Sequence, residues 1–395
     1  MSNNSIAETG QQYIMNTYGR FPISLVRGKG TYVWDADNKQ YLDFVGGIAT
    51  CALGHCNENL IQVLTEQAKT LWHVSNLYWI EPQVQLAEKL TAATGMDKAF
   101  FCNSGAEANE AAIKLARKYF YRQNQSKKNQ TITFKNSFHG RTLATVTATG
   151  QTKYQQGFAP LVPGFVYADY NDLPSVEAAV NENTAAIMVE TIQGEGGVIP
   201  ADINFLRGLR LICDREDLLL IIDEVQTGVG RTGKFLASQL YGIKPDIVTL
   251  AKGLGGGIPI GAALAVDKVA AAFEPGNHAS TFGGNPLVTA VAGKVTEIIS
   301  DEKFLKQVEK MGEYLSEKLL ALNDPRIVQF RARGLLQGME FDREVKDLVG
   351  ICMKKGLLLV NAGPNVLRFV PPLTVNEIEI NGAVAIISQA LQEWQ

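Results

Sequence analysis

The sequence lacks long hydrophobic runs. Its cleanest apolar stretches, such as 218–222, fall far short of the ~20 residues that a membrane-spanning helix needs. The first residues, Met1–Ser5, are polar and have neither the basic start nor the apolar stretch of a secretory signal. These absences exclude a membrane-spanning helix and predict a cytoplasmic protein.

Cysteine and histidine are scarce and scattered. Five cysteines in a long chain indicate reduced, buried thiols rather than a disulfide framework. Cys51, His55 and Cys56 could begin a zinc site, but no second cluster completes the four ligands that a closed site needs. We therefore expect neither disulfides nor a structural metal. The five cysteines are Cys51, Cys56, Cys102, Cys213 and Cys352.

The charge is nearly balanced. The 37 basic and 40 acidic residues give a formal net charge of -3, and no run of Lys or Arg concentrates the positive charge, so we expect no nucleic-acid partner. Apolar residues make up 46% and charged residues 19%, which is ordinary globular usage. At roughly 100–200 residues per domain, 395 residues predict two or three lobes.

Short apolar runs alternate with helix-length segments through the middle of the chain. Strands that are apolar throughout and separated by helices predict a mainly parallel sheet that is buried on both faces. This alternation of apolar strands and helices therefore predicts an α/β core of about seven strands. The predicted strands are Ala99–Cys102, Thr131–Phe134, Phe165–Ala168, Ala185–Val189, Leu218–Ile222, Ile247–Leu250 and Ala262–Val266, and the predicted covering helices include 108–122, 173–181 and 205–214.

The two ends of the chain have a different pattern. Residues 30–44 contain two segments of alternating apolar residues, and Asp37-Asn38 lies between them as the turn of a β-hairpin would. Residues 288–322 form a long amphipathic stretch, which is followed by further strand-like segments. We expect one smaller α+β lobe built from both ends. The predicted boundaries are 1–54 and 286–395 for this lobe and 55–285 for the large lobe.

Ligands of parallel sheets bind beyond the carboxyl ends of the strands. The strand at Ala99 ends in Asn103–Asn109 and continues directly into a helix. Small residues at a helix start expose backbone N–H groups that suit a phosphate. A simple helix N-cap is the alternative.

Two further strands end in ionisable residues. Asp223 follows 218–222 directly, and a carboxylate that leaves a buried strand needs a cation or a strong donor, unless it only caps the next loop. Lys252 follows the strand at Ile247 and precedes several glycines, which favours a desolvated, nucleophilic amine over a structural salt bridge. Pyridoxal phosphate requires a carboxylate that keeps its ring nitrogen protonated and a lysine that forms an imine with its aldehyde, and Asp223 and Lys252 would meet these two requirements.

One nucleotide-binding motif is incomplete. The stretch Gly228–Lys234 has the spacing of a P-loop, but Phe235 stands where Mg²⁺ coordination requires Ser or Thr. A non-enzymatic nucleotide-binding module is therefore the weaker hypothesis.

Several motifs together resemble the class III pyridoxal-phosphate aminotransferases of fold type I. The resemblance runs from about Tyr18 to Pro372. Within that group the chain is most similar to the N-acetylornithine δ-aminotransferases, through Tyr18-Gly-Arg20, Leu53-Gly-His55, 71–78, 361–364 and 367–369. The class motifs are Asn103–Asn109, Phe138-His-Gly-Arg141, Gln193-Gly-Glu195, Asp223-Glu-Val-Gln226, Ala251-Lys-Gly253 and Ser280–Asn285.

The resemblance implies a role for each matching residue. Lys252 would hold the cofactor's aldehyde carbon as an imine, and Asp223 would pair with the pyridine N–H. The remaining cofactor contacts would be Ser104, Gly105 and Ala106 at the phosphate, Phe138 and Val225 on the ring faces, Gln226 at the phenolic oxygen, and Thr281 from a partner subunit.

The resemblance also implies substrate contacts. Arg141 would hold the α-carboxylate and Arg368 a second carboxylate, with Glu195 neutralising Arg368 when the donor lacks one; a plain structural Glu–Arg pair is the alternative. Ser280 and Tyr18 would also contact the substrate. Thr191 and Asn57 depart from the usual family residues, and neither has an assigned role.

The implied activity is transfer of an amino group from N2-acetylornithine to 2-oxoglutarate by a homodimer. The alternative is a related ω-aminotransferase that uses N-succinyl-diaminopimelate, succinylornithine, ornithine or 4-aminobutyrate.

Overall fold

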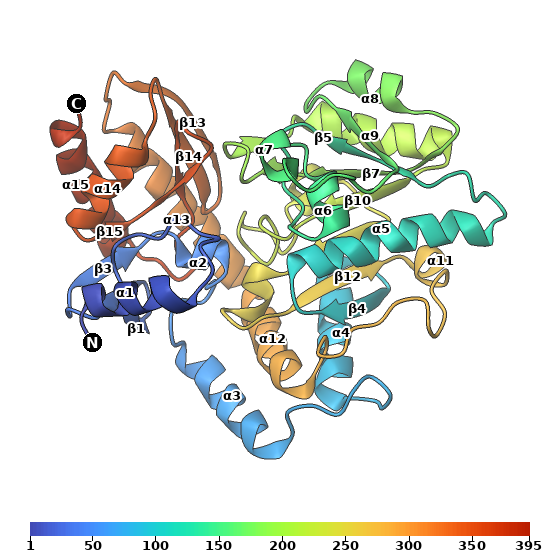
Figure 1. Cartoon of the computed structure of the whole chain (residues 1–395), viewed down its shortest axis with the longest axis horizontal. Coiled ribbons are helices and arrows are strands. Elements are labelled where there is room, and N and C mark those ends of the chain that lie inside the picture. Colours follow the sequence, from blue (N-terminus) through green and yellow to red (C-terminus); the bar gives the residue numbers. More distant parts are fainter.

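A computed structural model describes all residues, 1–395. A seven-stranded sheet forms the centre of the larger lobe (Figure 1), in the order β4-β12-β11-β10-β7-β5-β6. β12 runs antiparallel to both neighbours, and the other pairs are parallel. The prediction of a mainly parallel sheet is confirmed. Its strands are β4 (Lys98–Cys102), β5 (Gln130–Phe134), β6 (Phe165–Ala168), β7 (Thr184–Glu190), β10 (Leu219–Asp223), β11 (Ile247–Leu250) and β12 (Gly261–Ala265).

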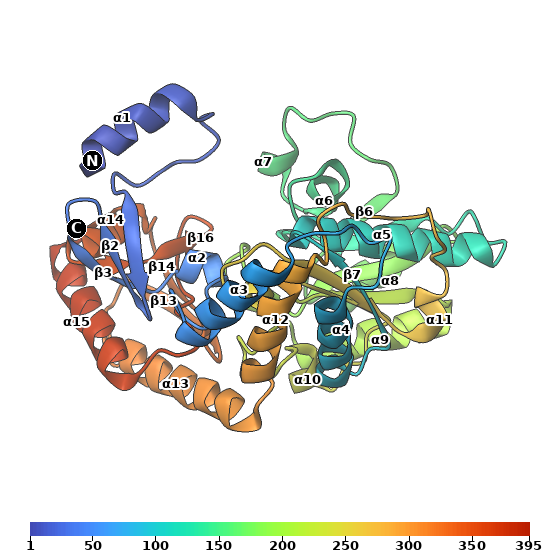
Figure 2. The ribbon, with the colours of Figure 1, turned by 90° about the horizontal axis from the view of Figure 1, so that it is seen from below.

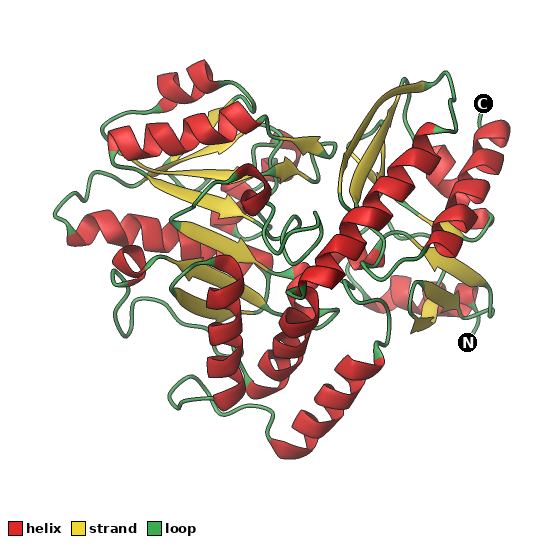
Figure 3. Ribbon diagram, turned by 180° about the vertical axis from the view of Figure 1, so that it is seen from behind, coloured by secondary structure: helices red, strands yellow, loops and turns green.

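Helices cover both faces of this sheet (Figure 3), as the continuous apolar strands require. One face packs against α8 (Leu173–Ala179) and α9 (Ile203–Glu216) in a cluster that includes Ile187 and Leu209. The other face packs against α5 (Gly105–Arg122) and α11 (Asp267–Ala270). No helix in the chain is both long and apolar enough to cross a membrane.

The two chain ends build the smaller lobe together (Figure 1). A strand of the C-terminal region, β15, pairs in parallel with β3 of the N-terminal hairpin, Leu357 beside Leu42. The hairpin turn contains Asn38 with φ 64°, as predicted for a turn residue. The lobe contains two four-stranded sheets, β1 (Leu25–Lys29), β2 (Tyr32–Asp35), β3 (Gln40–Asp43) and β15 (Leu357–Leu358), and β13 (Ile327–Arg333), β14 (Leu336–Phe341), β17 (Val366–Phe369) and β16 (Val360–Ala362).

The amphipathic stretch 288–322 forms two helices rather than one. α12 (Pro286–Ile299) ends at Ser300, and α13 (Glu302–Leu320) begins at Asp301, whose carboxylate accepts the N–H groups of Lys303 and Phe304. The apolar periodicity continues across this N-cap, which explains why the pattern alone shows no break. Figure 2 shows α12 between the lobes, and it packs against α3 (Glu58–Thr70) and α4 (Glu81–Thr94).

The remaining elements are short connections or terminal helices. They are α1 (Asn3–Tyr13), α2 (Gly46–Ala49), α6 (Leu143–Ala148), α7 (Thr152–Gln155), β8 (Ile192–Gln193), β9 (Ile199–Pro200), α10 (Ser238–Tyr241), the 3₁₀ helix η1 (Lys252–Gly255), α14 (Lys346–Lys354) and α15 (Glu377–Glu393). The domain boundaries proposed from the sequence stay predictions.

Candidate active site

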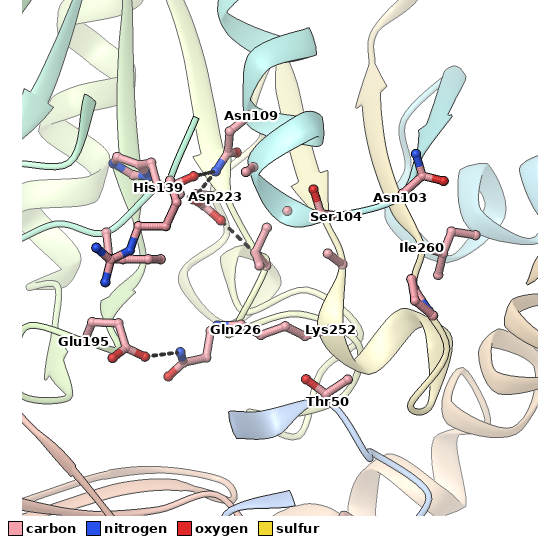
Figure 4. A pocket seen from close by; sticks show the side chains of 18 of the residues that line it. Thr50, Asn103, Ser104, Asn109, His139, Glu195, Asp223, Gln226, Lys252 and Ile260 are labelled. Atoms are coloured by element: carbon pink, nitrogen blue, oxygen red, sulfur yellow. Dashed lines mark hydrogen bonds and ion pairs between the residues drawn. The ribbon is translucent and has the colours of Figure 1, made fainter. Parts of the chain in front are cut away.

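A cavity of about 400 Å³ lies at the carboxyl ends of the central strands. The ends of β4, β7, β10 and β11 contribute to it, together with the N-terminus of α5 and Thr50 from the smaller lobe (Figure 4). This is where parallel sheets bind ligands. Ten of the residues predicted from the sequence line it: Ser104, Gly105, Ala106, Phe138, Arg141, Glu195, Asp223, Val225, Gln226 and Lys252.

Asp223 is a buried carboxylate with fixed orientation. Its Oδ2 accepts hydrogen bonds from Nδ2 of Asn109 and Nδ1 of His139, each at 2.8 Å, and its Oδ1 accepts the Val225 N–H at 3.0 Å. Buried anions need such donors. Asn109 and His139 belong to the sequence motifs, but no role was predicted for either.

Lys252 begins η1 two positions after the end of β11, with a left-handed φ of 42°. Such a conformation strains a residue that is not glycine, and strain of this kind is common at functional sites. Burial lowers the pKa of Lys252; Glu195 opposes this shift and Arg368 adds to it. A lowered pKa increases the fraction of neutral amine, which is the nucleophilic form.

The N-terminus of α5 presents unpaired donors. The Ser104 hydroxyl caps the helix by accepting the Glu107 N–H at 3.2 Å. The N–H groups of Gly105 and Ala106 have no acceptor within the chain. Gly105 is also tightly enclosed, because a Cβ there would lie 2.7 Å from Cγ1 of Val225. A helix start with free N–H groups is suited to bind a phosphate.

Glu190 is a second buried acid, beside Asp223 in the register of β7 and β10. Its Oε2 accepts the backbone N–H of Phe138 at 3.0 Å. Burial raises the pKa of Glu190, although His139 opposes the shift. Sequence reasoning missed Glu190, yet the signal that singled out Asp223, an acid at the end of an apolar strand, was present.

Arg368 on β17 is fully buried and pairs with Glu195. Its Nη1 lies 2.5 Å from Glu195 Oε1 and its Nη2 lies 3.3 Å from Oε2, so the two groups face each other along two contacts. Gln226 joins the pair: its Nε2 donates to Glu195 Oε1 at 3.1 Å, and its Oε1 accepts from Arg368 Nη1 at 3.1 Å.

The Glu195–Arg368 pair is stable over the ordinary pH range. Burial raises the pKa of Glu195, but Arg368 outweighs it and lowers the pKa to about 2. A carboxylate whose pKa is lowered by folding stabilises the fold at pH values above its ordinary pKa of 4.5. This stabilisation is lost as the pH falls through the lowered pKa of about 2.

Arg141 is a free cation at the cavity. Its guanidinium carbon lies 4.1 Å from the ring centroid of Tyr154 and 5.5 Å from that of Phe138. No carboxylate of the chain pairs with Arg141, in contrast to Arg368. Its planar donors are therefore available to a carboxylate ligand.

Arg368 contacts the cavity through its lining residues Glu195 and Gln226, and three other predicted residues lie away from it. The Ser280 hydroxyl accepts hydrogen bonds from Asn103 Nδ2 and from the Gly283 N–H, while Thr281 is exposed on the same loop. Tyr18 lies on the N-terminal segment and is 71% exposed. The structure brings none of the three into the cavity within one chain, so their roles stay predictions.

The P-loop-like stretch packs between the lobes. Residues 228–233 are buried, and Lys234 lies 3.5 Å from Glu309 rather than facing an open helix N-terminus. This packing leaves no space for a nucleotide.

The fold and these residues are those of a pyridoxal-phosphate enzyme of fold type I. An aminotransferase class-III family model matches residues 13–391, and the chain belongs to this family.

Individual relatives cover almost the full chain. The acetylornithine aminotransferase of Caldanaerobacter subterraneus subsp. tengcongensis is 50% identical, over 97% of this chain and 98% of that protein. The succinylornithine transaminase of Photorhabdus laumondii subsp. laumondii is 48% identical, over 97% of each. A solved structure of the Toxoplasma gondii ornithine aminotransferase, with partial occupancy of pyridoxal phosphate at its active site, matches with a TM-score of 0.95 at 32% identity, over 99% of this chain and 94% of that chain.

The class uses pyridoxal phosphate, and the cavity fits this cofactor. The unpaired N–H groups of Gly105 and Ala106 suit its phosphate, and the fixed carboxylate of Asp223 suits its protonated ring nitrogen. Lys252 supplies an amine within the same cavity.

Replacing Gly105 by Ala should weaken cofactor binding by about tenfold, equivalent to ~1.4 kcal/mol, because the new Cβ displaces Val225. Gly350 is the matched control: it lies within α14 with open space around it, so Gly350→Ala should leave cofactor affinity unchanged. Titration of the apo protein with pyridoxal phosphate measures both. Equal affinities for Gly105→Ala and wild type would contradict the phosphate site.

Proposed function

We propose that the protein transfers the δ-amino group of N2-acetylornithine to 2-oxoglutarate, giving N-acetylglutamate 5-semialdehyde and glutamate. One observation carries the proposal: a free Arg141 lines the cavity that contains Lys252 and Asp223, and the buried Arg368, already neutralised by Glu195, contacts the cavity residues Glu195 and Gln226. The names of the relatives support the same substrate. Arginine biosynthesis in the cytoplasm is the corresponding role.

The cofactor, when bound, supplies a ring that accepts the electron pair released from the substrate carbon. Asp223 keeps the proton on the ring nitrogen, because a buried carboxylate favours a protonated neighbour. Lys252 Nζ would take the proton from the substrate carbon that bears the amino group and would hold it within the cavity for return to the cofactor, where one is bound. Its lowered pKa makes the neutral amine available for this transfer.

The two arginines would distinguish the two substrates. Arg141 would bind the α-carboxylate of N2-acetylornithine, while Glu195 keeps Arg368 neutralised. Glutamate carries a second carboxylate, which would replace Glu195 on Arg368. Exchange of one carboxylate for another avoids leaving a buried cation unpaired.

Succinylornithine is a second candidate substrate, favoured by the 48% identity to a succinylornithine transaminase. A different acyl group at the same amine changes transition-state binding only modestly when it extends beyond the charged contacts.

Mixing the holoenzyme with single amines tests the substrate. We expect N2-acetylornithine to convert the cofactor to its amine form faster than ornithine, N-succinyl-diaminopimelate, succinylornithine or 4-aminobutyrate do. Stopped-flow absorbance of the bound cofactor measures each rate. A faster reaction with another amine would replace the substrate and retain the class.

Lys252→Ala should abolish turnover, with a loss of at least about 10⁴-fold in kcat, because no other amine in the cavity moves the proton. The visible absorbance of the lysine-bound cofactor should also disappear. Lys244→Ala, at an exposed lysine between α10 and β11, is the control and should retain both. Substantial turnover by Lys252→Ala would contradict the role of Lys252.

We also infer that the protein forms a homodimer. Segments 71–79 and 280–283 lie together, since Asn76 Nδ2 donates to the carbonyls of Ser280 and Gly283. Large apolar side chains on these segments are exposed, and such patches are typical of interfaces. They are Trp72, Leu77, Tyr78, Trp79 and Phe282, with Trp79 91% exposed. A partner here would bring Thr281 of each chain toward the other's site.

The double variant Leu77→Asp, Trp79→Asp should sediment as a monomer and lose activity, because two charges would enter an apolar interface. Leu211→Asp is the control, since Leu211 is equally a surface leucine but lies on α9. An active wild-type monomer in sedimentation velocity would contradict the dimer.

A further inference from the structure

The loop between β10 and α10 connects the cavity to the smaller lobe. Its second and third residues, Val225 and Gln226, line the cavity. Glu224 closes its base: Oε1 accepts the Ser238 N–H at 2.7 Å, and Oε2 accepts the Ala237 N–H at 3.0 Å. The loop is therefore held at both ends by one buried carboxylate.

Arg231 lies in the middle of this loop and has no acidic partner, although it is only 2% exposed. Burial lowers the pKa of Arg231 to about 9, so the side chain is still a cation at neutral pH. Its Nη1 donates to the carbonyls of Leu335, at 3.1 Å, and Pro371, at 2.6 Å. Its own carbonyl accepts the Leu335 N–H at 3.0 Å.

These two carbonyls flank the strand pair that carries Arg368. Leu335 directly precedes β14, and Pro371 follows β17 by two positions. Within that pair Gly338 is in register with Arg368. The same loop thus contacts the Arg368 guanidinium through Gln226. Through Arg231 it also holds the ends of β14 and β17, the two paired strands beside Arg368.

The contact between loop and strands is close. A Cβ on Gly334, which has φ +52°, would lie 2.7 Å from the carbonyl carbon of Thr232 and 2.8 Å from the Arg231 oxygen. Backbone atoms on both sides leave no flexible side chain to absorb a displacement. A change at Arg231 is therefore transmitted to β14 and β17.

We propose that Arg231 is a positioning residue that sets the place of Arg368 relative to Glu195, and through it the recognition of the substrate's second carboxylate. The proposal rests on the proposed function, in which glutamate offers that carboxylate to Arg368. The segment Gly228–Lys234 would then have a structural role, which is to connect the cavity loop to the smaller lobe.

The test uses the Arg231→Gln holoenzyme and follows the bound cofactor's absorbance with glutamate and, separately, with N2-acetylornithine. The glutamate concentration that gives the half-maximal rate should rise about tenfold, because Arg368 is displaced. The corresponding value for N2-acetylornithine should change by less than about threefold, since Arg141 binds its carboxylate. The cofactor spectrum should stay the same.

Arg326→Gln is the matched control. Arg326 also donates to two carbonyls of the smaller lobe, those of Leu391 and Trp394, and it pairs with Asp324. The hydrogen bonds of its side chain reach neither the loop nor β14 or β17. Its replacement should leave the ratio of the two half-reactions unchanged.

Two further variants keep the test decisive where Arg231→Gln does not fold. Arg231→Lys retains the charge and one donor and should show a smaller, still glutamate-selective rise. Gly334→Ala alters the same contact from the side of β14, because its Cβ would meet the backbone of Arg231 and Thr232, and it should produce the same glutamate-selective rise. Equal losses in both half-reactions, or no change, would overturn the role of Arg231. If the cofactor of the wild-type holoenzyme reacts with neither glutamate nor N2-acetylornithine, that result would instead contradict the proposed function.

Discussion

The Arg368 guanidinium is fully buried, and the carboxylate of Glu195 balances its charge inside the protein. Removing one partner of a buried ion pair is costly, so Arg368 is expected to keep a carboxylate beside it whenever the lobes are packed as they are here. The smaller lobe supplies the arginine and the larger lobe supplies the acid. The pair therefore links the packing of the two lobes to the chemistry of the cavity, and any ligand that enters must preserve the charge balance.

The rest of the cavity follows from the topology of the sheet. Parallel strands end at one edge, so Asp223, Glu190 and Lys252 meet there although they are far apart in sequence. Helix α5 begins at the same edge and offers its unpaired N–H groups. The two buried carboxyl groups at this edge each accept specific hydrogen bonds: Asn109 and His139 donate to Asp223, and the Phe138 N–H donates to Glu190.

The sequence predicted the sheet well, because strands buried on both faces are continuous apolar runs that end in distinctive residues. Asp223 and Lys252 were found in this way. Asn109, His139 and Glu190 were not assigned, since their hydrogen bonds join strands and helices that only the folded sheet brings together. The break at Asp301 was missed because an N-cap does not interrupt apolar periodicity. The contact between Gln226 and Arg368 spans 142 positions, and no local pattern announces it.

The most direct test of this account is the ratio of the two half-reactions in Glu195→Gln. Glutamine keeps the shape of Glu195 and removes its charge, so Arg368 loses its internal counterion and gains one only from a ligand with a second carboxylate. We predict that the rate with N2-acetylornithine, relative to the rate with glutamate, falls by about tenfold or more in rapid-mixing absorbance measurements. An unchanged ratio would contradict the claim that one exchangeable buried ion pair lets the cavity accept both substrates.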